Sequence, residues 1–215
     1  MNESSTLPVP VPDPAPSRRP VIAVVGGSGK LGRAVIVAAR AAGADVRVLT
    51  RSTLDETGGI AVITGDATRR ADLAKALKGA DAAISVVGPV RGGPRDVSSR
   101  AALELLHVCR DTGPRRLVMV TGALVGARRL GPFYRVLRRL IGWLDGGALA
   151  DRVMAEKILM ATTLDWTIVR PPRLDDRVDG AIELGVDIVV GARDRIGRTA
   201  LARKLVGLAL SRDGI

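Results

Sequence analysis

Short runs of apolar, mostly β-branched residues alternate with longer segments of helical spacing from residue 21 to residue 210. Because the runs are apolar throughout, they indicate strands that are buried on both faces. Strands of this kind separated by helices predict a doubly wound α/β fold, a single parallel sheet with helices on both sides. The expected strands are 21–25, 46–49, 60–64, 82–87, 117–121 and 166–169, with a last one near 187–190, and the expected helices are 30–42, 69–77, 97–110 and 196–210.

The first nineteen residues differ from the rest of the chain. Six of the twelve prolines fall within the first twenty residues, and each proline fixes φ and lacks an N–H donor. We therefore expect a disordered or polyproline-like tail over residues 1–19 and the α/β domain over residues 20–215. The N-terminus has neither the basic nor the apolar region of a signal peptide, and no apolar stretch reaches the roughly 18 residues of a transmembrane helix. A single cysteine, Cys109, fits a reducing cytoplasm.

The formal net charge of +11 raises the question of a nucleic-acid or membrane ligand. Only 5 of the 33 basic residues are lysine, a bias that coding composition can explain. Aromatic residues make up 2% of the chain, which leaves few stacking platforms for single strands. The composition therefore disfavours nucleic-acid binding.

The first predicted strand runs directly into a glycine-rich turn, AVVGGSGKLGRAV over residues 23–35. A strand, a glycine turn and a helix N-terminus form the unit that binds a dinucleotide pyrophosphate, because backbone N–H groups reach the phosphates where no Cβ intervenes. A purely structural turn is the alternative. The residues expected around the pyrophosphate are Gly26, Ser28, Gly29, Lys30, Leu31 and Gly32.

The G-x-x-G-x-x-G spacing resembles that of the short-chain dehydrogenase/reductase superfamily, in its extended and atypical branches. Three later segments resemble motifs of that superfamily in the same order: Thr64-Gly65-Asp66-Ala67, Lys78 to Gly88, and Leu164 to Pro171. Together they resemble the NAD(P)H-binding, NmrA-like and biliverdin-reductase-B-like group over residues 20–210. The resemblance implies a Rossmann-like fold, with Asp66 and Ala67 beside the adenine, Gly88 where the cofactor passes the fourth strand, and Pro171 at the nicotinamide.

The residues after the second predicted strand favour NADP(H) over NAD(H). This strand ends in Val48-Leu49-Thr50-Arg51-Ser52, without the acidic residue that usually binds the ribose hydroxyls of NAD. A guanidinium suits a 2′-phosphate, so we expect Arg51 to bind that group. Lys30 matches a position where related NADP-binding members carry a second cation. Two ordinary surface charges are the alternative.

The usual proton-transfer residues of the superfamily are missing. Many extended members read Y-x-x-x-K-x-x-x-E on the helix before the sixth strand, and this frame falls on Ala148, Arg152 and Glu156. Thr121 stands at the position of the family's serine. By analogy, Thr121 and Arg152 are expected to face the nicotinamide ribose and are the candidate catalytic residues. A displaced Tyr134–Arg138 pair is the alternative, although Tyr134 lies at the edge of an apolar helical stripe.

His107 and the basic segment 128–144 are two further candidate features. His107 has no partner at metal-ligand spacing, and no cluster of His, Cys, Asp or Glu indicates a metal. The segment 128–144 has a basic amphipathic pattern, for which we favour a helix packed on its own domain over one bound to a membrane surface or a protein partner. A lid whose arginines bind an acidic substrate is a third interpretation.

Two functions are consistent with these features. The first is an NADPH-dependent reductase that transfers hydride to a small acceptor such as a flavin or quinone, with the proton supplied by solvent or substrate, as the resemblance to biliverdin-reductase-B-like members implies. The second is a non-catalytic NADP(H)-sensing regulator of the NmrA-like type that acts on a protein partner. The missing Tyr–Lys pair favours the sensor. The absence of a large substrate domain favours the reductase, which is our preferred prediction.

Overall fold

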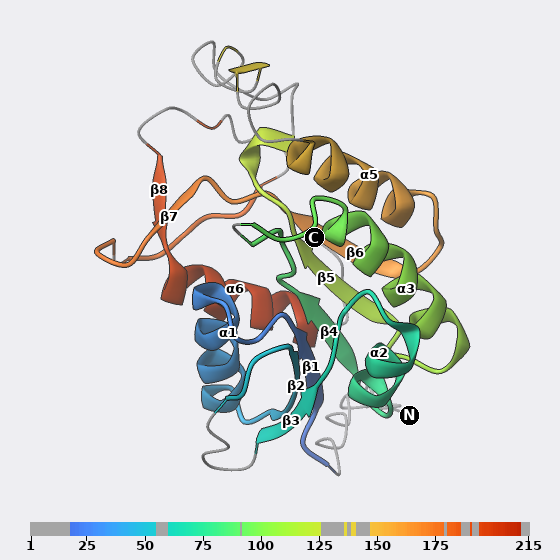
Figure 1. Cartoon of the computed structure of the whole chain (residues 1–215). Coiled ribbons are helices and arrows are strands. Elements are labelled where there is room, and N and C mark those ends of the chain that lie inside the picture. The colour runs from blue at the N-terminus through green and yellow to red at the C-terminus, as the bar shows by residue number, and fades with distance from the viewer. Residues whose placement is uncertain are drawn as a thin grey trace, which may run out of the picture.

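The computed structural model describes residues 18–54, 60–90, 92–125, 136, 139–140, 147–178, 180–185, 190 and 194–211. Six parallel strands form the main sheet, in the order β3-β2-β1-β4-β5-β6 (Figure 1). This order reverses beside β1 and is that of a doubly wound Rossmann-like domain, so the predicted fold class is confirmed. The strands are β1 (Val21–Val25), β2 (Asp45–Thr50), β3 (Ile60–Thr64), β4 (Ala82–Ser85), β5 (Arg116–Val120) and β6 (Asp165–Val169).

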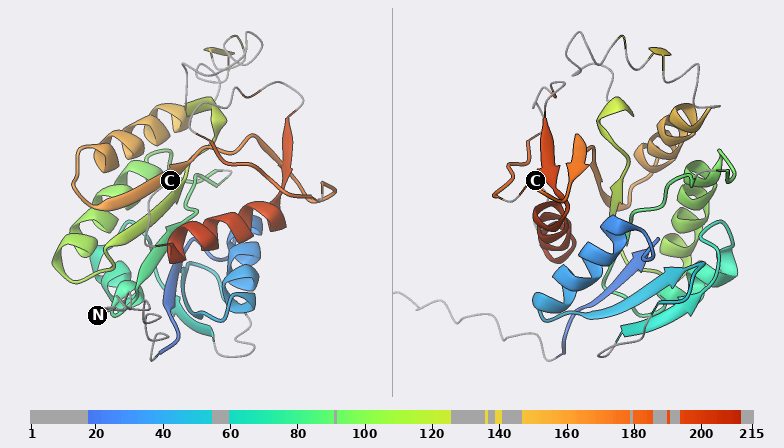
Figure 2. Two further views of the ribbon diagram at one scale, coloured as in Figure 1. Left: turned by 180° about the vertical axis from the view of Figure 1, so that it is seen from behind. Right: turned by 60° about the vertical axis from the view of Figure 1, so that its left-hand side comes forward.

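Helices cover both faces of this sheet. Of the helices within the described residues, two pack on one face and three on the other, and Figure 2 shows helices on both sides of the sheet. Along β1, the side chains of Ile22 and Val24 belong to one core cluster and those of Ala23 and Val25 to the other, and this explains why the strand is apolar at every position. The helices are α1 (Lys30–Ala41) and α6 (Arg198–Leu210) on the first face, and α2 (Arg70–Leu77), α3 (Val97–Asp111) and α5 (Ala148–Met160) on the second.

The C-terminal segment differs from the sequence-based expectation. Two short strands, β7 (Arg173–Asp175) and β8 (Arg195–Gly197), form a separate parallel pair, and an ion pair of 3.1 Å joins Arg195 to Asp175. This pairing takes up residues 195–197, so the closing helix begins at Arg198 rather than at Ile196. Of the strand expected near 187–190, only Val190 lies within the described residues, where it forms a single bridge.

The start of β1 is held by Asp81, the last residue of the K-G-A-D segment. Its Oδ2 accepts hydrogen bonds from the N–H of Val21 at 2.8 Å and from Arg18 at 2.9 Å. Partial burial raises the pKa of Asp81, but these two donors outweigh it and lower the pKa on balance. Residues 1–17 of the expected tail lie outside the described residues.

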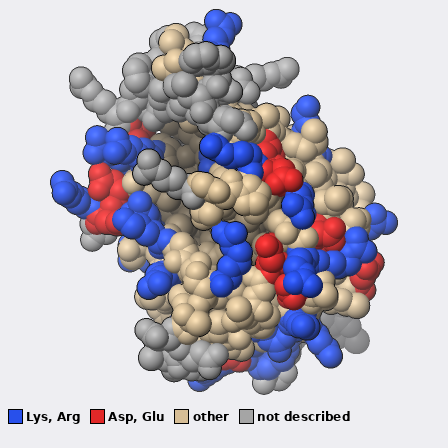
Figure 3. Space-filling view, in the orientation of Figure 1, with Lys and Arg blue, Asp and Glu red and all other residues tan. Residues whose placement is uncertain are grey.

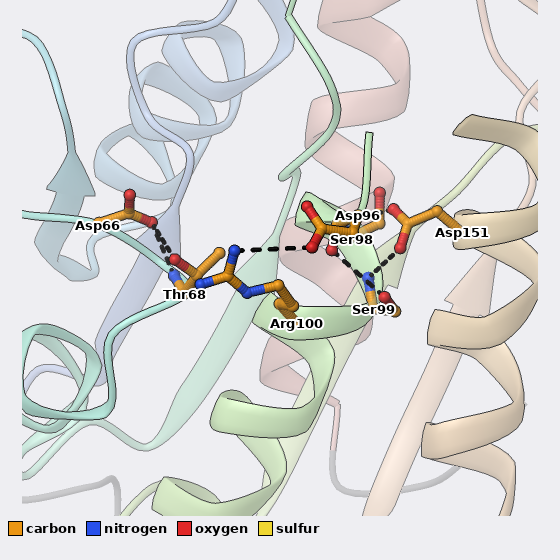
Figure 4. A network of polar contacts seen from close by, with 7 residues as sticks. All are labelled: Asp66, Thr68, Asp96, Ser98, Ser99, Arg100 and Asp151. Carbon is orange, nitrogen blue, oxygen red and sulfur yellow. Dashed lines mark hydrogen bonds and ion pairs between the residues drawn. The ribbon is translucent and has the colours of Figure 1, made fainter. Parts of the chain in front are cut away.

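Asp151 on α5 caps the N-terminus of α3. Its two carboxylate oxygens accept hydrogen bonds from the N–H groups of Ser98 at 2.8 Å and Ser99 at 3.0 Å (Figure 4). The side chain of Asp96, which occupies the N-cap position of α3, makes no capping bond. The cap therefore comes from a neighbouring helix, and it couples the end of α3 to the position of α5.

Replacing Asp151 by alanine is expected to lower the free energy of unfolding by about 1–3 kcal/mol, because two N–H groups lose their buried acceptor. Urea denaturation with linear extrapolation measures this change. Asp96→Ala is the matched control, with an expected loss of at most about 0.5 kcal/mol, because its side chain forms only an exposed ion pair with Arg100. Equal losses in the two variants would contradict the capping role of Asp151.

Candidate functional site

The glycine turn follows β1 and leads into α1. Gly26 has a φ of +93°, and its N–H donates to the carbonyl of Leu49 on β2 at 3.0 Å. A Cβ on Gly26 would lie 3.2 Å from the carbonyl carbon of Val86, and a Cβ on Gly32 would clash with the carbonyl oxygen of Gly26. Gly26 and Gly32 are therefore required by the packing of the turn itself.

Gly29 is different. Its φ of −67° and ψ of 159° suit any residue, and a Cβ there would lie 3.7 Å from the carbonyl oxygen of Gly26, an ordinary contact. Neither strain nor packing among the described residues requires glycine at this position. Gly29 lines a cleft, where the absence of a Cβ allows a ligand to approach the backbone.

This cleft has a volume of about 310 Å³ and lies at the carboxyl ends of β1, β2 and β4. In open α/β sheets, ligands bind where the strand order reverses, and β1 lies at this point here. The lining contains seven of the residues that the sequence assigns to the cofactor. The full lining is Gly26, Ser28, Gly29, Leu49, Thr50, Arg51, Gly65, Asp66, Ala67, Val86, Val87, Gly88, Val90 and Val97.

One edge of the cleft offers an acceptor beside a donor. Oδ1 of Asp66 accepts hydrogen bonds from the N–H of Thr68 at 2.8 Å and from its hydroxyl at 2.9 Å (Figure 4). The Thr68 N–H holds the pKa of Asp66 below its usual value, although partial burial opposes this effect. Within the described parts of the chain, Oδ2 of Asp66 and the N–H of Ala67 have no hydrogen-bond partner. Such a pair complements the amino group and ring nitrogen at one edge of adenine.

Arg51 follows β2 and lies at another edge of the cleft. Thr50 fixes the turn that presents it, because the hydroxyl of Thr50 donates to the carbonyl of Ser52 at 3.1 Å and accepts from its N–H at 3.2 Å. Arg51 is exposed, and the described residues give its guanidinium no hydrogen bond or ion pair. Asp66 is the one acidic side chain among the described residues of the cleft lining, and the charge of Arg51 contributes to lowering its pKa. The two side chains form no ion pair in the described structure, so the N–H groups of Arg51 can bind an anionic ligand.

Ala148, Arg152 and Glu156 follow each other at intervals of four along α5 and so share one face of this helix. Glu156 is 4% exposed and accepts a hydrogen bond of 2.5 Å from the hydroxyl of Thr121. It also pairs with Arg170, whose Nη2 lies 2.7 Å from Oε2, and this contact raises the pKa of Arg170. The hydroxyl of Thr121 is therefore turned toward a buried carboxylate.

Glu156 and Arg170 each lie in a segment that resembles a family motif, but no short-range spacing in the sequence connects the two. The network that they form with Thr121 joins α5 to the carboxyl ends of β5 and β6. The N–H of Thr121 donates to the carbonyl of Val169 at 3.0 Å, and that of Ala123, in the short 3-10 helix Ala123–Val125, donates to the carbonyl of Pro171 at 2.9 Å. The nicotinamide contacts expected for Thr121, Arg152 and Pro171 stay predictions, and none of the three lines the cleft.

Lys30 and Leu31, the other two residues of the glycine turn that were expected at the pyrophosphate, do not line the cleft. Lys30 is exposed in the first turn of α1, and Leu31 packs against the core cluster on that face of the sheet. Tyr134, Arg135 and Arg138 lie outside the described residues, as does most of the segment 128–144. The interpretations offered for that segment therefore stay predictions.

His107 lies in a surface cluster. Its Nδ1 is 3.5 Å from Glu104, and it also contacts Arg70. Among the residues that the structure describes, no three His, Cys, Asp or Glu side chains are arranged to hold a metal. Cys109 is buried, and burial raises its pKa to about 11, so its thiol is protonated and unreactive at neutral pH.

The charged side chains on the surface bear on the ligands that a basic protein can bind. On the face in Figure 3, Lys and Arg side chains are interspersed with Asp and Glu rather than gathered into one patch. Across the described part of the chain, no helix is long and apolar enough to cross a membrane.

A doubly wound sheet, a glycine turn and a cleft at the reversal point define a Rossmann-type dinucleotide-binding domain. The family model described as NAD(P)H-binding matches residues 26–211, and the chain belongs to this family. The predicted membership of an NAD(P)H-binding group is thereby confirmed.

Individual relatives are more distant. The isoflavone reductase homolog IRL of Zea mays is 34% identical over 87 residues, which are 35% of this chain but only 28% of the maize protein. An uncharacterized chloroplastic protein of Arabidopsis thaliana is 25% identical over 201 residues, 85% of this chain and 68% of that protein. A wide-type short-chain dehydrogenase/reductase of Veillonella parvula, solved in complex with NADP, is similar in structure, with a TM-score of 0.71 at 14% identity. The matched region covers 91% of this chain and 89% of the Veillonella parvula chain.

Proposed function

We propose that this protein is an NADPH-dependent oxidoreductase that transfers a hydride to a small acceptor such as a flavin or quinone. The observation that carries the proposal is the cleft at the strand reversal, which gathers Gly29, Arg51 and the Asp66–Ala67 edge. Membership of the NAD(P)H-binding family supports a nicotinamide nucleotide as the ligand. The NADP bound to the Veillonella parvula protein fits this assignment.

Each part of the cleft has a role in this proposal. Gly29 admits the pyrophosphate, the Asp66–Ala67 edge binds adenine, and Arg51 binds the 2′-phosphate that distinguishes NADPH from NADH. When bound, NADPH supplies the hydride. The protein holds the cofactor and the acceptor next to each other.

The proton that completes the reduction comes from water. Ala148 has no proton to give, and an arginine such as Arg152 stays protonated at neutral pH. The hydroxyl of Thr121 donates its hydrogen to Glu156, so it is not directed at a substrate. Flavins and quinones suit such a site, since the heteroatom that gains the proton can take it from solvent.

A non-catalytic NADP(H) sensor is the second candidate. The same Thr121–Glu156 hydrogen bond favours it, because the one hydroxyl at the family's serine position is already engaged. In a sensor, the bound nucleotide would change the affinity for a protein partner through a difference in binding between two states.

Calorimetric titration with NADPH and NADH, followed by flavin and quinone reduction on the same sample, tests both candidates. We expect NADPH to bind at least tenfold more tightly than NADH and to be oxidised in the presence of an acceptor. Tight binding without turnover over a broad panel of flavins and quinones would favour the sensor. Failure to bind either nucleotide would refute the proposal.

A further inference from the structure

Arg152 lies beside the cleft, and no described residue provides a counterion for it. It is partly buried on α5, and its Nη2 is 3.8 Å from the position that a Cβ on Gly88 would occupy. Gly88 lines the cleft directly after β4. Within the ranges that the structure describes, the guanidinium of Arg152 has no hydrogen bond or ion pair.

The two nearest acidic residues on α5 are both engaged elsewhere. Asp151 precedes Arg152 in the chain, and its carboxylate accepts from the N–H groups of Ser98 and Ser99. Glu156 lies one turn further along and is bound to Thr121 and Arg170. A partly desolvated guanidinium without an anion is unfavourable, and neither of these two carboxylates is available to neutralise it.

From this arrangement we infer that Arg152 is an anion-binding residue that holds phosphate or carboxylate oxygens above Gly88. A guanidinium presents two parallel N–H groups to such oxygens, which a lysine at this position could not do. The role differs from the contact to ribose hydroxyls that the family frame implies for this position. Two sources could supply the anion, the pyrophosphate of the cofactor and an acidic group of the acceptor, and the second rests on the proposed function.

Inorganic pyrophosphate is the first probe, because its binding does not depend on catalysis. Calorimetric titration of the full chain is expected to show binding that weakens at least tenfold in Arg152→Gln. Lys157→Gln is the matched control, since Lys157 is an exposed cation on the same helix, and it is expected to bind pyrophosphate within twofold of the unmodified protein. Arg152→Lys keeps the positive charge but loses the two parallel N–H groups, so its pyrophosphate affinity is expected to lie between those of Arg152→Gln and Lys157→Gln. It also serves as the second variant if Arg152→Gln unfolds, as monitored by thermal melting.

Titrations with NADPH and its fragment, and kinetics with two flavin acceptors, distinguish the two sources of the anion. If the cofactor supplies the anion, Arg152→Gln weakens NADPH at least tenfold and leaves adenosine 2′,5′-bisphosphate, which has no pyrophosphate, unchanged. If the acceptor supplies it, the affinity for NADPH is unchanged, while a preference for FMN over riboflavin in KM is lost. Either result supports the inference.

Equal pyrophosphate affinity in the unmodified protein, Arg152→Gln and Lys157→Gln, or no binding by any of them, would overturn the inference. Failure of the proposed function looks different. In that case neither NADPH nor NADH binds, although pyrophosphate still binds in a manner that depends on Arg152.

Discussion

Replacing Arg51 by glutamate is expected to weaken NADPH binding by well over tenfold and to leave NADH binding nearly unchanged. The guanidinium lies at the edge of the cleft and forms no ion pair among the described residues, so its N–H groups can bind a 2′-phosphate. Charge reversal at such a contact costs at least about 1.4 kcal/mol, which corresponds to one decade in affinity. Parallel calorimetric titrations with the two nucleotides measure the effect.

Arg203→Glu on α6 is the control for the change in net charge, because Arg203 is exposed and does not line the cleft. It is expected to leave both affinities within twofold of those of the unmodified protein. An equal loss for NADPH and NADH in Arg51→Glu would show that Arg51 acts on the structure of the turn and not on the 2′-phosphate.

Alanine substitutions at two glycines of the same turn are expected to have different effects on stability and on NADPH binding. Gly32→Ala is expected to lower the free energy of unfolding by about 3 kcal/mol and to abolish nucleotide binding, because its Cβ would clash with the carbonyl oxygen of Gly26 and lie only 2.7 Å from the Cα of Gly27. Gly29→Ala is expected to change stability by less than about 0.5 kcal/mol. It should nevertheless weaken NADPH at least tenfold, because the new methyl group lies between the backbone and the pyrophosphate.

Urea denaturation and NADPH titration on the same two variants test this difference. Unchanged NADPH affinity in Gly29→Ala would mean that the pyrophosphate does not approach the turn at this residue. A large loss of stability in Gly29→Ala would mean that packing, and not the ligand, requires the glycine.

The local patterns of the chain were sufficient to predict the sheet and the turn. A strand such as β1 packs against helices on both faces, and this burial is visible as an uninterrupted apolar run. Gly26 and Gly32 could be identified from spacing alone because the tight turn acts over a few residues. The β7–β8 pair was missed, since strands of three residues carry too little pattern to be recognised.

Contacts between distant residues were decided only by the tertiary structure. Asp151 caps a helix that begins about fifty residues earlier in the chain, and Glu156 joins Thr121 to Arg170. Arg116 is another example, with its Nε bound to the carbonyl of Leu208 at 2.9 Å inside the protein. No periodicity records such pairs, because each depends on how a helix is placed on the sheet.

The sequence by itself therefore determined the alternation of strands and helices and the glycine turn, both of which depend on residue type and short-range spacing. Packing decided which charges are neutralised. Asp151 and Glu156 are turned toward α3 and the ends of β5 and β6, so neither neutralises Arg152 beside Gly88, and no other described residue does. The chemical role of a charged side chain depends on its neighbours in space, because pairing and desolvation act through space and not along the chain.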